Sequence, residues 1–235
     1  MNKPIYYVGG GKGGVGKSMV SMALLDYLTH EKGENTYLVE TDTSNPDVYK
    51  TYAEEVPAML LNLDKEEGWL DLINVADANR EAAIVINSAA RNADGVNTYG
   101  ELLNETVAEM KRKLIVFWVI NRNRDSVELL KEFMNTITNA DIHVIKNLYF
   151  GRDEEFTLYN GSNTRAEIER RGGKSLSFER LAERVSTQIY NERISIETAM
   201  NKMPYSSSLA LKLWRRQVRD MFNAAISPTA KARTA

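Results

Sequence analysis

A glycine-rich run combines residue types that bind phosphate. The run reads GGGKGGVGKS and contains Gly11, four residues of any type, and then Gly16, Lys17 and Ser18. This GxxxxGK[ST] spacing defines a phosphate-binding loop (P-loop), and here it stands between an apolar run and a helical pattern, as such a loop requires. Glycines allow successive backbone N–H groups to approach one phosphate. The residues that we expect to bind the phosphates of a nucleotide are Gly11, Lys12, Gly13, Gly14, Val15, Gly16, Lys17, Ser18 and Met19.

Two polar side chains of this loop have distinct expected roles. Lys17 is expected to reach the β- and γ-phosphates, and the Ser18 hydroxyl is expected to bind Mg²⁺. The helix that begins near Lys17 adds the partial positive charge of its N-terminus. The alternative is a glycine-rich turn that contains Gly-Lys-Ser by chance, and the strand–loop–helix context argues against it.

A second lysine, Lys12, stands inside the loop. An ordinary P-loop needs no cation there, and two crowded lysines repel each other unless phosphate is present. The stretch KGGVGKS resembles the deviant Walker A motif of the ParA/MinD ATPases. In that family the extra lysine reaches across a dimer to the partner's nucleotide, so the resemblance implies a catalytic contact in trans for Lys12. A solvated lysine is the alternative.

The second apolar run leads into the polar stretch ETDTSNP. It resembles the family's second acidic motif, usually Asp-x-Asp-Pro, except that Glu40 replaces the first Asp, two extra residues precede the proline, and no glutamine follows it. Ligands gather at the carboxyl ends of parallel strands, so Asp42 should face the γ-phosphate. The resemblance implies that Asp42 orients or activates the attacking water and that Glu40 supports the water shell of Mg²⁺. Asp42 as the N-cap of the next helix is a compatible alternative.

The fourth apolar run ends on Asn87, where the family has the Walker B aspartate followed by a proline-rich switch. An amide oxygen still accepts a hydrogen bond from an Mg²⁺-bound water, but it carries no negative charge. We therefore expect Asn87 to join Ser18 and Glu40 around the metal with weaker coupling to Mg²⁺ and slow turnover. Asp94, in the following loop, is an alternative source of the missing carboxylate.

Two further polar loops follow later strands. Asn147 ends a strand that resembles the one whose terminal asparagine reads the adenine edge in this family, and a side-chain amide suits adenine because it both donates and accepts. A plain turn residue at Asn147 is the alternative. We expect Arg122 and Arg124, in the loop after the fifth apolar run, to be solvated rather than to contact phosphate.

These residues need a scaffold of alternating strands and helices. Several apolar runs are apolar on successive residues, as expected for strands covered on both faces, and stretches with helical spacing lie between them. The pattern predicts an α/β fold with a doubly wound, mostly parallel sheet flanked by helices, which is the P-loop NTPase fold that the resemblance implies. The expected strands are Ile5–Val8, Thr36–Thr41, Ala58–Leu63, Ala82–Asn87, Leu114–Ile120 and Ile142–Phe150.

The last third of the chain is helical and more basic. One apolar stripe comprises Phe178, Leu181, Val185 and Ile189, and a second comprises Leu211, Trp214, Val218, Met221 and Ala225. Cations lie outside the second stripe at Lys212, Arg215, Arg216 and Arg219. Members of the MinD branch dock on membranes through such a segment, but a helix that closes the core is the commoner use, so we expect no membrane partner. The basic face is then a candidate surface for nonspecific DNA. We expect one domain over residues 1–226 and a disordered tail over residues 227–235.

Composition narrows the class of protein. The 235 residues are 43% hydrophobic and 26% charged with a net charge of −2, which is typical of a globular protein and confines any nucleic-acid surface to a local patch. No cysteine is present, so disulfides, thiolate metal sites and cysteine nucleophiles are excluded. The N-terminus leads directly into the first strand and no apolar run is long enough to span a membrane. We expect a cytoplasmic protein, associated with the nucleoid if it binds DNA.

The resemblance implies an ATP- and Mg²⁺-dependent switch that dimerises on ATP, hydrolyses it slowly and releases on hydrolysis, with an adaptor or activating protein as partner. Partition of plasmid DNA is the leading expectation, and an accessory ATPase of conjugative plasmid transfer is the alternative. An ATP-dependent ligase of the dethiobiotin synthetase type is a third possibility, against which Lys12 argues. The iron–sulfur branch of the family is excluded because it holds its clusters through cysteines.

Overall fold

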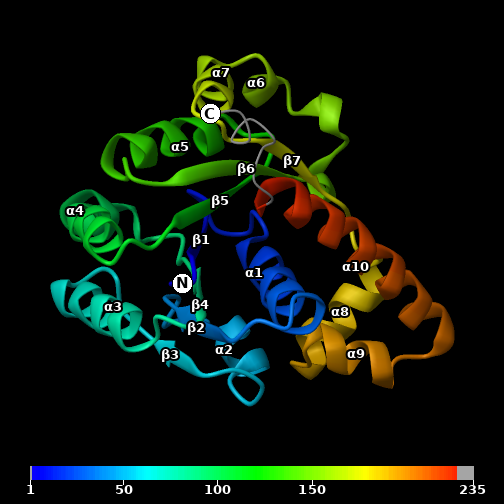
Figure 1. Cartoon of the computed structure of the whole chain (residues 1–235). Helices are drawn as coiled ribbons and strands as arrows, with labels where there is room; N and C mark the ends of the chain where they lie inside the picture. Colours follow the sequence, from blue (N-terminus) through cyan, green and yellow to red (C-terminus); the bar gives the residue numbers. More distant parts are fainter. Residues whose placement is uncertain (1, 227–235) are drawn as a thin grey trace, which may run out of the picture.

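The computed structural model describes residues 2–226, and the expected tail 227–235 lies outside the described residues. Seven strands form one parallel sheet in the order β3-β2-β4-β1-β5-β6-β7 (Figure 1). Every strand pair is parallel, as the sequence pattern predicts. The strands are β1 (Ile5–Gly9), β2 (Thr36–Glu40), β3 (Ala58–Leu60), β4 (Ala83–Asn87), β5 (Leu114–Ile120), β6 (Asp141–Asn147) and β7 (Ser175–Phe178).

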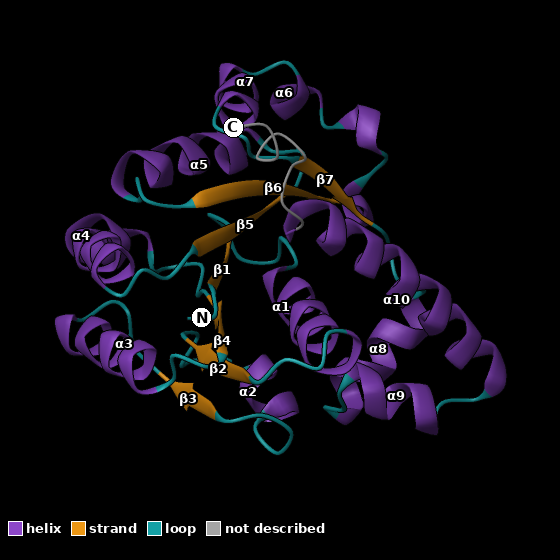
Figure 2. Ribbon diagram, in the orientation of Figure 1, coloured by secondary structure: helices purple, strands orange, loops and turns teal. Residues whose placement is uncertain are grey.

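Helices cover both faces of this sheet, as Figure 2 shows. On one face lie α1 (Lys17–Asp26), continued by one π-helical turn over Tyr27–Glu31, α2 (Asp47–Tyr52), α8 (Glu183–Glu192), α9 (Ile196–Lys202) and α10 (Tyr205–Ile226). On the other lie α3 (Glu66–Ala78), α4 (Ala93–Glu109), α5 (Arg124–Thr136), α6 (Thr157–Asn160) and α7 (Asn163–Arg170). Short 3₁₀ turns at Leu148–Phe150 and Asp153–Glu155 follow β6.

Strand β1 shows why the sheet forms where it does. Its side chains alternate between two hydrophobic cores: Tyr6 and Val8 face α1 and α10, whereas Ile5 and Tyr7 face α4 and α5. All four are at most 3% exposed. A strand that is apolar on successive residues is therefore buried on both sides, as parallel sheets require.

The sequence reading was wrong at two places in the second half of the chain. Phe178 belongs to the edge strand β7 and not to a helical stripe, because its spacing to Leu181 and Val185 only imitates helical periodicity. The sixth strand ends at Asn147 instead of Phe150, because the Asn147 side chain accepts the Tyr149 N–H and turns the backbone into a 3₁₀ helix.

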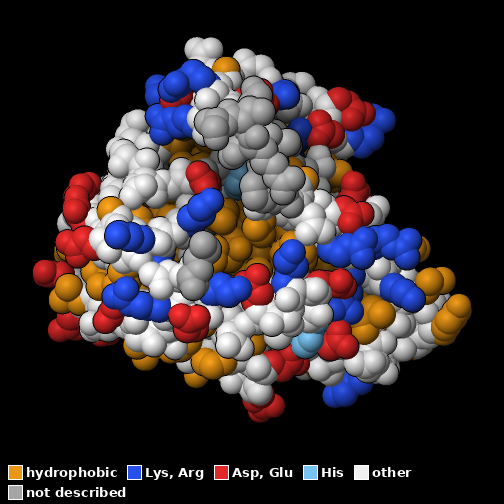
Figure 3. Space-filling model, viewed as in Figure 1, with side chains coloured by type: hydrophobic (Ala, Val, Ile, Leu, Met, Phe, Trp, Pro, Cys, Tyr) orange, Lys and Arg blue, Asp and Glu red, His pale blue; other side chains and the backbone are white. Residues whose placement is uncertain are grey.

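Helix α10 is a core helix, since the predicted stripe from Leu211 to Ala225 is buried. Arg215, however, is not part of its exposed basic face. Its guanidinium binds Asp26 of α1 at 2.9 and 3.0 Å and also contacts Glu197 of α9. Lys212 and Arg216 remain exposed, and Figure 3 shows lysine and arginine side chains gathered over this helix.

Candidate nucleotide-binding site

The P-loop joins the end of β1 to the start of α1, as its sequence predicts. Two of its glycines are required by backbone conformation, because φ is 76° at Gly14 and 103° at Gly16. L side chains rarely adopt these values. Gly16 is also the N-cap of α1, so the loop delivers the helix N-terminus to the site. This arrangement of backbone N–H groups and helix end is suited to an anion.

Lys17 is the buried cation of the site. The side chain is 8% exposed, and its ammonium donates to the backbone carbonyl oxygen of Lys12 at 2.9 Å. Burial lowers the pKa of Lys17 to about 8, although Asp42 and Glu40 oppose the change. A cation in this state gains stability from an anionic ligand, which phosphate would supply.

Lys12 is exposed and pairs with an acidic side chain of its own chain. Its ammonium forms an ion pair with Asp125, in the first turn of α5, and both side chains are about half exposed. The pair lowers the pKa of Asp125. Lys12 is thus held within its own chain at an accessible position, and its contact in trans stays a prediction.

Glu40 and Asn87 are register partners at the carboxyl ends of β2 and β4. The Asn87 amide nitrogen donates to both Glu40 carboxylate oxygens, at 2.9 and 3.0 Å, and the Asn87 amide oxygen accepts the Ser21 hydroxyl at 2.8 Å. Burial raises the pKa of Glu40 to about 7, against the effect of the hydrogen bonds from the Asp42 N–H and Asn87. The pair therefore holds a fully buried carboxyl group at the centre of this edge of the sheet.

Asp42 does not cap the next helix. Helix α2 begins at Asp47 with Pro46 as its N-cap, so the N-cap alternative was wrong. Instead, one Asp42 carboxylate oxygen accepts the backbone N–H groups of Ser44 and Asn45, both at 3.2 Å. Burial acts to raise the pKa of Asp42, but the Ser44 hydroxyl, which donates to the same oxygen at 2.5 Å, acts together with these two N–H groups and Arg91 to hold it below its usual value. Asp42 is consequently an ionised side chain in an Asx turn, and its role toward a γ-phosphate stays a prediction.

The residues present fit an Mg²⁺ ion that protein and nucleotide hold together. Across residues 2–226 no cluster of three His, Asp or Glu side chains is suited to hold a metal. Mg²⁺ commonly takes one or two protein oxygens together with phosphate oxygens and waters. Ser18, in the first turn of α1, would be the direct ligand, with Glu40 behind it. Asp94 lies exposed in the first turn of α4, where nothing links it to this group.

Asn147 connects the end of β6 to the P-loop. Its amide nitrogen donates to the Val15 carbonyl oxygen at 2.8 Å, and a Cβ on Gly16 would approach that nitrogen to 2.3 Å. Next to it is a pocket of about 340 Å³, where the Arg180 guanidinium lies over the Tyr149 ring at 5.5 Å. Because both hydrogen-bonding groups of Asn147 are used within the chain, its expected contact with adenine stays a prediction.

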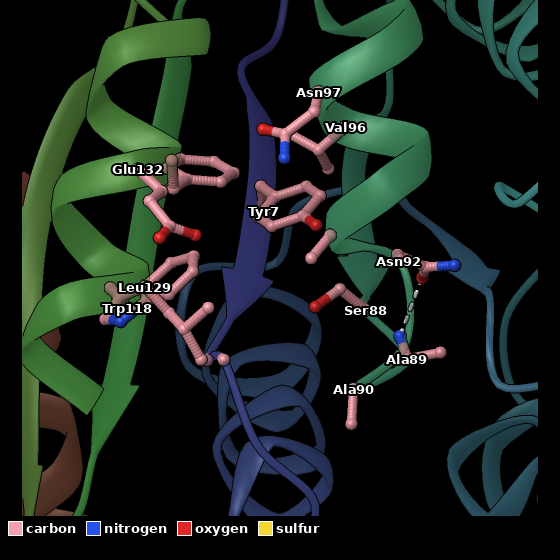
Figure 4. Close-up of a pocket in the computed structure, with 14 residues that line it drawn as sticks. Tyr7, Ser88, Ala89, Ala90, Asn92, Val96, Asn97, Trp118, Leu129 and Glu132 are labelled. Atoms are coloured by element: carbon pink, nitrogen blue, oxygen red, sulfur yellow. Dashed lines mark hydrogen bonds between the residues drawn. The ribbon is translucent and has the colours of Figure 1, made fainter. Parts of the chain in front are cut away.

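A second, narrower pocket lies between α4 and α5, beside the start of the P-loop (Figure 4). Its walls are mostly apolar, and the one charged side chain among the described residues that line it is Glu132. No lysine or arginine is among these described lining residues.

Sequence reasoning missed three polar partners of the site: Ser21, Arg91 and Asp125. The sequence indicated only that Ser21 lies in a helix and that Asp125 belongs to a polar loop. Arg91 reaches the loop of Asp42, with 3.6 Å between its Nη1 and the Asp42 carboxylate. Arg122, which was expected to be solvated, pairs with Glu155.

None of the described helices is long and apolar enough to cross a membrane.

Comparisons with known proteins identify the family of this chain. Residues 6–161 match the family described as CbiA, the CobQ/CobB/MinD/ParA nucleotide binding domain. Protein MobD of Acidithiobacillus ferrooxidans is 51% identical over 226 residues, which cover 96% of this chain and 99% of MobD.

Solved structures share the fold at low sequence identity. The MinD cell division protein of Aquifex aeolicus superposes with a TM-score of 0.54 at 14% identity and covers 96% of this chain and 99% of its own. MinD of Pyrococcus horikoshii, solved with Mg-ADP, gives the same TM-score and identity over 96% of this chain and 100% of its own. From the family match over residues 6–161 and the 51% identity to MobD, the chain belongs to the CobQ/CobB/MinD/ParA family of nucleotide-binding domains.

Proposed function

We propose that this protein is an ATP-dependent, Mg²⁺-requiring molecular switch that dimerises on ATP and hydrolyses it slowly. The observation that carries the proposal is the pair of P-loop lysines. Lys17 is buried and donates to a carbonyl oxygen of the loop, whereas Lys12 is half exposed and paired with Asp125. On this basis we infer that Lys17 serves the chain's own nucleotide and that Lys12 serves the nucleotide of a second chain.

Each site residue has a role in this proposal. The P-loop N–H groups and Lys17 bind the phosphates, and Ser18 holds Mg²⁺ with Glu40 and Asn87 behind it. Mg²⁺ supplies charge neutralisation at the phosphates when it is bound. Asp42, which is ionised, accepts a hydrogen bond from the attacking water. We expect turnover to be slow because Asn87 adds no negative charge behind Mg²⁺.

We place this switch in the mobilisation of plasmid DNA during conjugative transfer. The name of the 51%-identical relative, MobD, hints at mobilisation and favours transfer over the partition role that the sequence pattern put first. The exposed cations Lys212 and Arg216 on α10 are the surface that we assign to DNA, and an activating protein is the expected second partner.

Light scattering tests the switch directly. We expect the 26.6 kDa chain to double its mass with ATP–Mg²⁺ but not with ADP–Mg²⁺. Lys12→Ala should remain monomeric with ATP while it still binds the nucleotide, because Lys17 is untouched. Lys131→Ala, on the exposed face of α5, is the matched control and should dimerise normally. A mass that ignores the nucleotide, or a Lys12→Ala protein that dimerises like the control, would contradict the proposal.

A further inference from the structure

Side chains join the loops that follow β2, β3 and β4, although no sequence motif predicts this connection. Asp64, in the loop after β3, is the residue at the centre of this connection. One of its carboxylate oxygens accepts the Asn92 amide nitrogen at 2.9 Å, and the other accepts the Arg91 Nε at 2.6 Å. Both oxygens of one carboxylate are therefore bound by adjacent residues of the loop after β4.

Arg91 extends the connection to the loop of Asp42. Its Nη2 donates to the Thr43 hydroxyl at 2.8 Å, and its Nη1 donates to the Ser44 hydroxyl at 3.2 Å. A planar guanidinium with donors on three nitrogens is suited to hold several acceptors at fixed angles. Arg91 thus bridges three loops at the edge of the sheet where the P-loop also lies.

Asn92 forms the buried part of the same connection. It occupies the N-cap position of α4 and is 1% exposed, yet its side chain caps no helix N–H group. Its amide oxygen instead accepts the Thr41 hydroxyl at 2.6 Å and the Ala89 N–H at 2.9 Å. An asparagine at this position normally stabilises its helix, so here the side chain serves the loops instead.

We propose that Asp64, Arg91 and Asn92, here called the loop clasp, make the Asp42 loop and the loop after β4 respond to nucleotide as one body. These three are positioning residues, and Asp42 is the group that they position. The loop after β4 contains no proline between Ser88 and Asn92, so no proline ring fixes its φ angles, and the hydrogen bonds of Asn92 to Thr41 and Ala89 are among its contacts. The catalytic part of this inference rests on the proposed function.

Hydrogen exchange on the full chain tests whether the loops are coupled. Arg91→Ala should accelerate exchange about threefold or more in residues 41–49, which carry the amides bonded to Asp42. Asp42→Ala should do the same in residues 88–96. Asp64→Asn, which keeps the side-chain shape, should affect both loops. Arg80→Ala is the control, because Arg80 is an equally exposed partner of Asp77 at the opposite end of the sheet. Variants that each change only their own loop would overturn the clasp.

Hydrolysis kinetics test the positioning role. Arg91→Ala should lower kcat about tenfold and leave the KM for ATP within about twofold, because the P-loop contacts remain. Arg91→Lys should recover little, since an ammonium cannot bridge three acceptors. A raised KM with unchanged kcat would instead make Arg91 a nucleotide ligand and refute positioning. If the wild-type chain binds no ATP, the proposed function fails, and hydrogen exchange without nucleotide still decides whether the clasp exists.

Discussion

The loop after β1 and the carboxyl ends of β2 and β4 meet at one edge of the sheet but hold their charges differently. Lys17 donates to a backbone carbonyl, and burial lowers its pKa. Glu40, by contrast, is held on both oxygens by the amide of Asn87, and burial raises its pKa. The cationic half is thus prepared for an external anion, whereas the acidic half is already satisfied inside the protein. The affinity for nucleotide should therefore depend strongly on Lys17 and only weakly on Glu40 and Asn87.

The largest expected effect comes from removing the cation. Lys17→Ala should weaken ATP binding by about 100-fold or more, because charge-assisted hydrogen bonds to the β- and γ-phosphates are lost in a buried site. Titration calorimetry with ATP–Mg²⁺ measures it, with Lys131→Ala as the control. Unchanged affinity would mean that the phosphates do not bind at this loop. It would contradict the view that the Lys17 half of the site is prepared for an external anion.

A second experiment converts the acidic half into a pair of like charges. Asn87→Asp removes both amide donors to Glu40 and places a carboxylate about 3 Å away. We expect the free energy of unfolding at pH 8 to fall by about 2 kcal/mol and to recover near pH 5, where the two groups share a proton. Urea unfolding measures the change.

Asn97→Asp is the matched control for that experiment. It is exposed on α4 and keeps the acceptor that Asn97 offers to the Thr136 hydroxyl. A loss in Asn87→Asp that is independent of pH would speak against charge repulsion. If Mg²⁺ restores stability in this variant alone, the new carboxylate has taken up the stronger metal coupling expected of an aspartate at this position.

A third expected effect is the pH dependence that Glu40 contributes. Its folded pKa lies above the unfolded value, so the folded state binds the proton more tightly. This stabilisation is complete below about pH 4.5 and is lost as the pH rises through about 7. It should amount to on the order of 2–3 kcal/mol and should be missing in Glu40→Gln. Urea unfolding from pH 4.5 to 7.5 tests this. A Glu40→Gln protein with the same pH slope as wild type would show that Glu40 is not the group responsible.

Most of the fold was predictable because its signals are local. The apolar runs that became β1, β4 and β5 are continuous, and burial on both faces leaves few other structures for them. Strand β7 was not predicted because Ser175–Phe178 is short and lies at the sheet edge, and the helical spacing of the neighbouring residues dominates the sequence pattern there. A four-residue edge strand carries too little periodicity to be recognised.

The residues of the site differ in the same way, because those that are contiguous in sequence could be predicted and those that meet only in the folded protein could not. The P-loop is one contiguous stretch, so its residues and their order indicate its chemistry. Arg91 and Asp125, by contrast, are separated in the chain from Asp42 and Lys12, and only the packed sheet brings each pair together. Asn87 lies between the two cases: its position followed from the strand, but its hydrogen bonds to Ser21 and Glu40 depended on tertiary structure.

The ion pair between Asp26 and Arg215 has a consequence for how the chain is made. It joins α1, which begins at the P-loop, to α10, the last described helix, across 189 positions of sequence. Because Arg215 lies in the last described helix, this contact forms only after nearly all of the described chain has been synthesised. Contacts of such long sequence separation slow folding, so we expect the end of α1 that lies away from the P-loop to be fixed late.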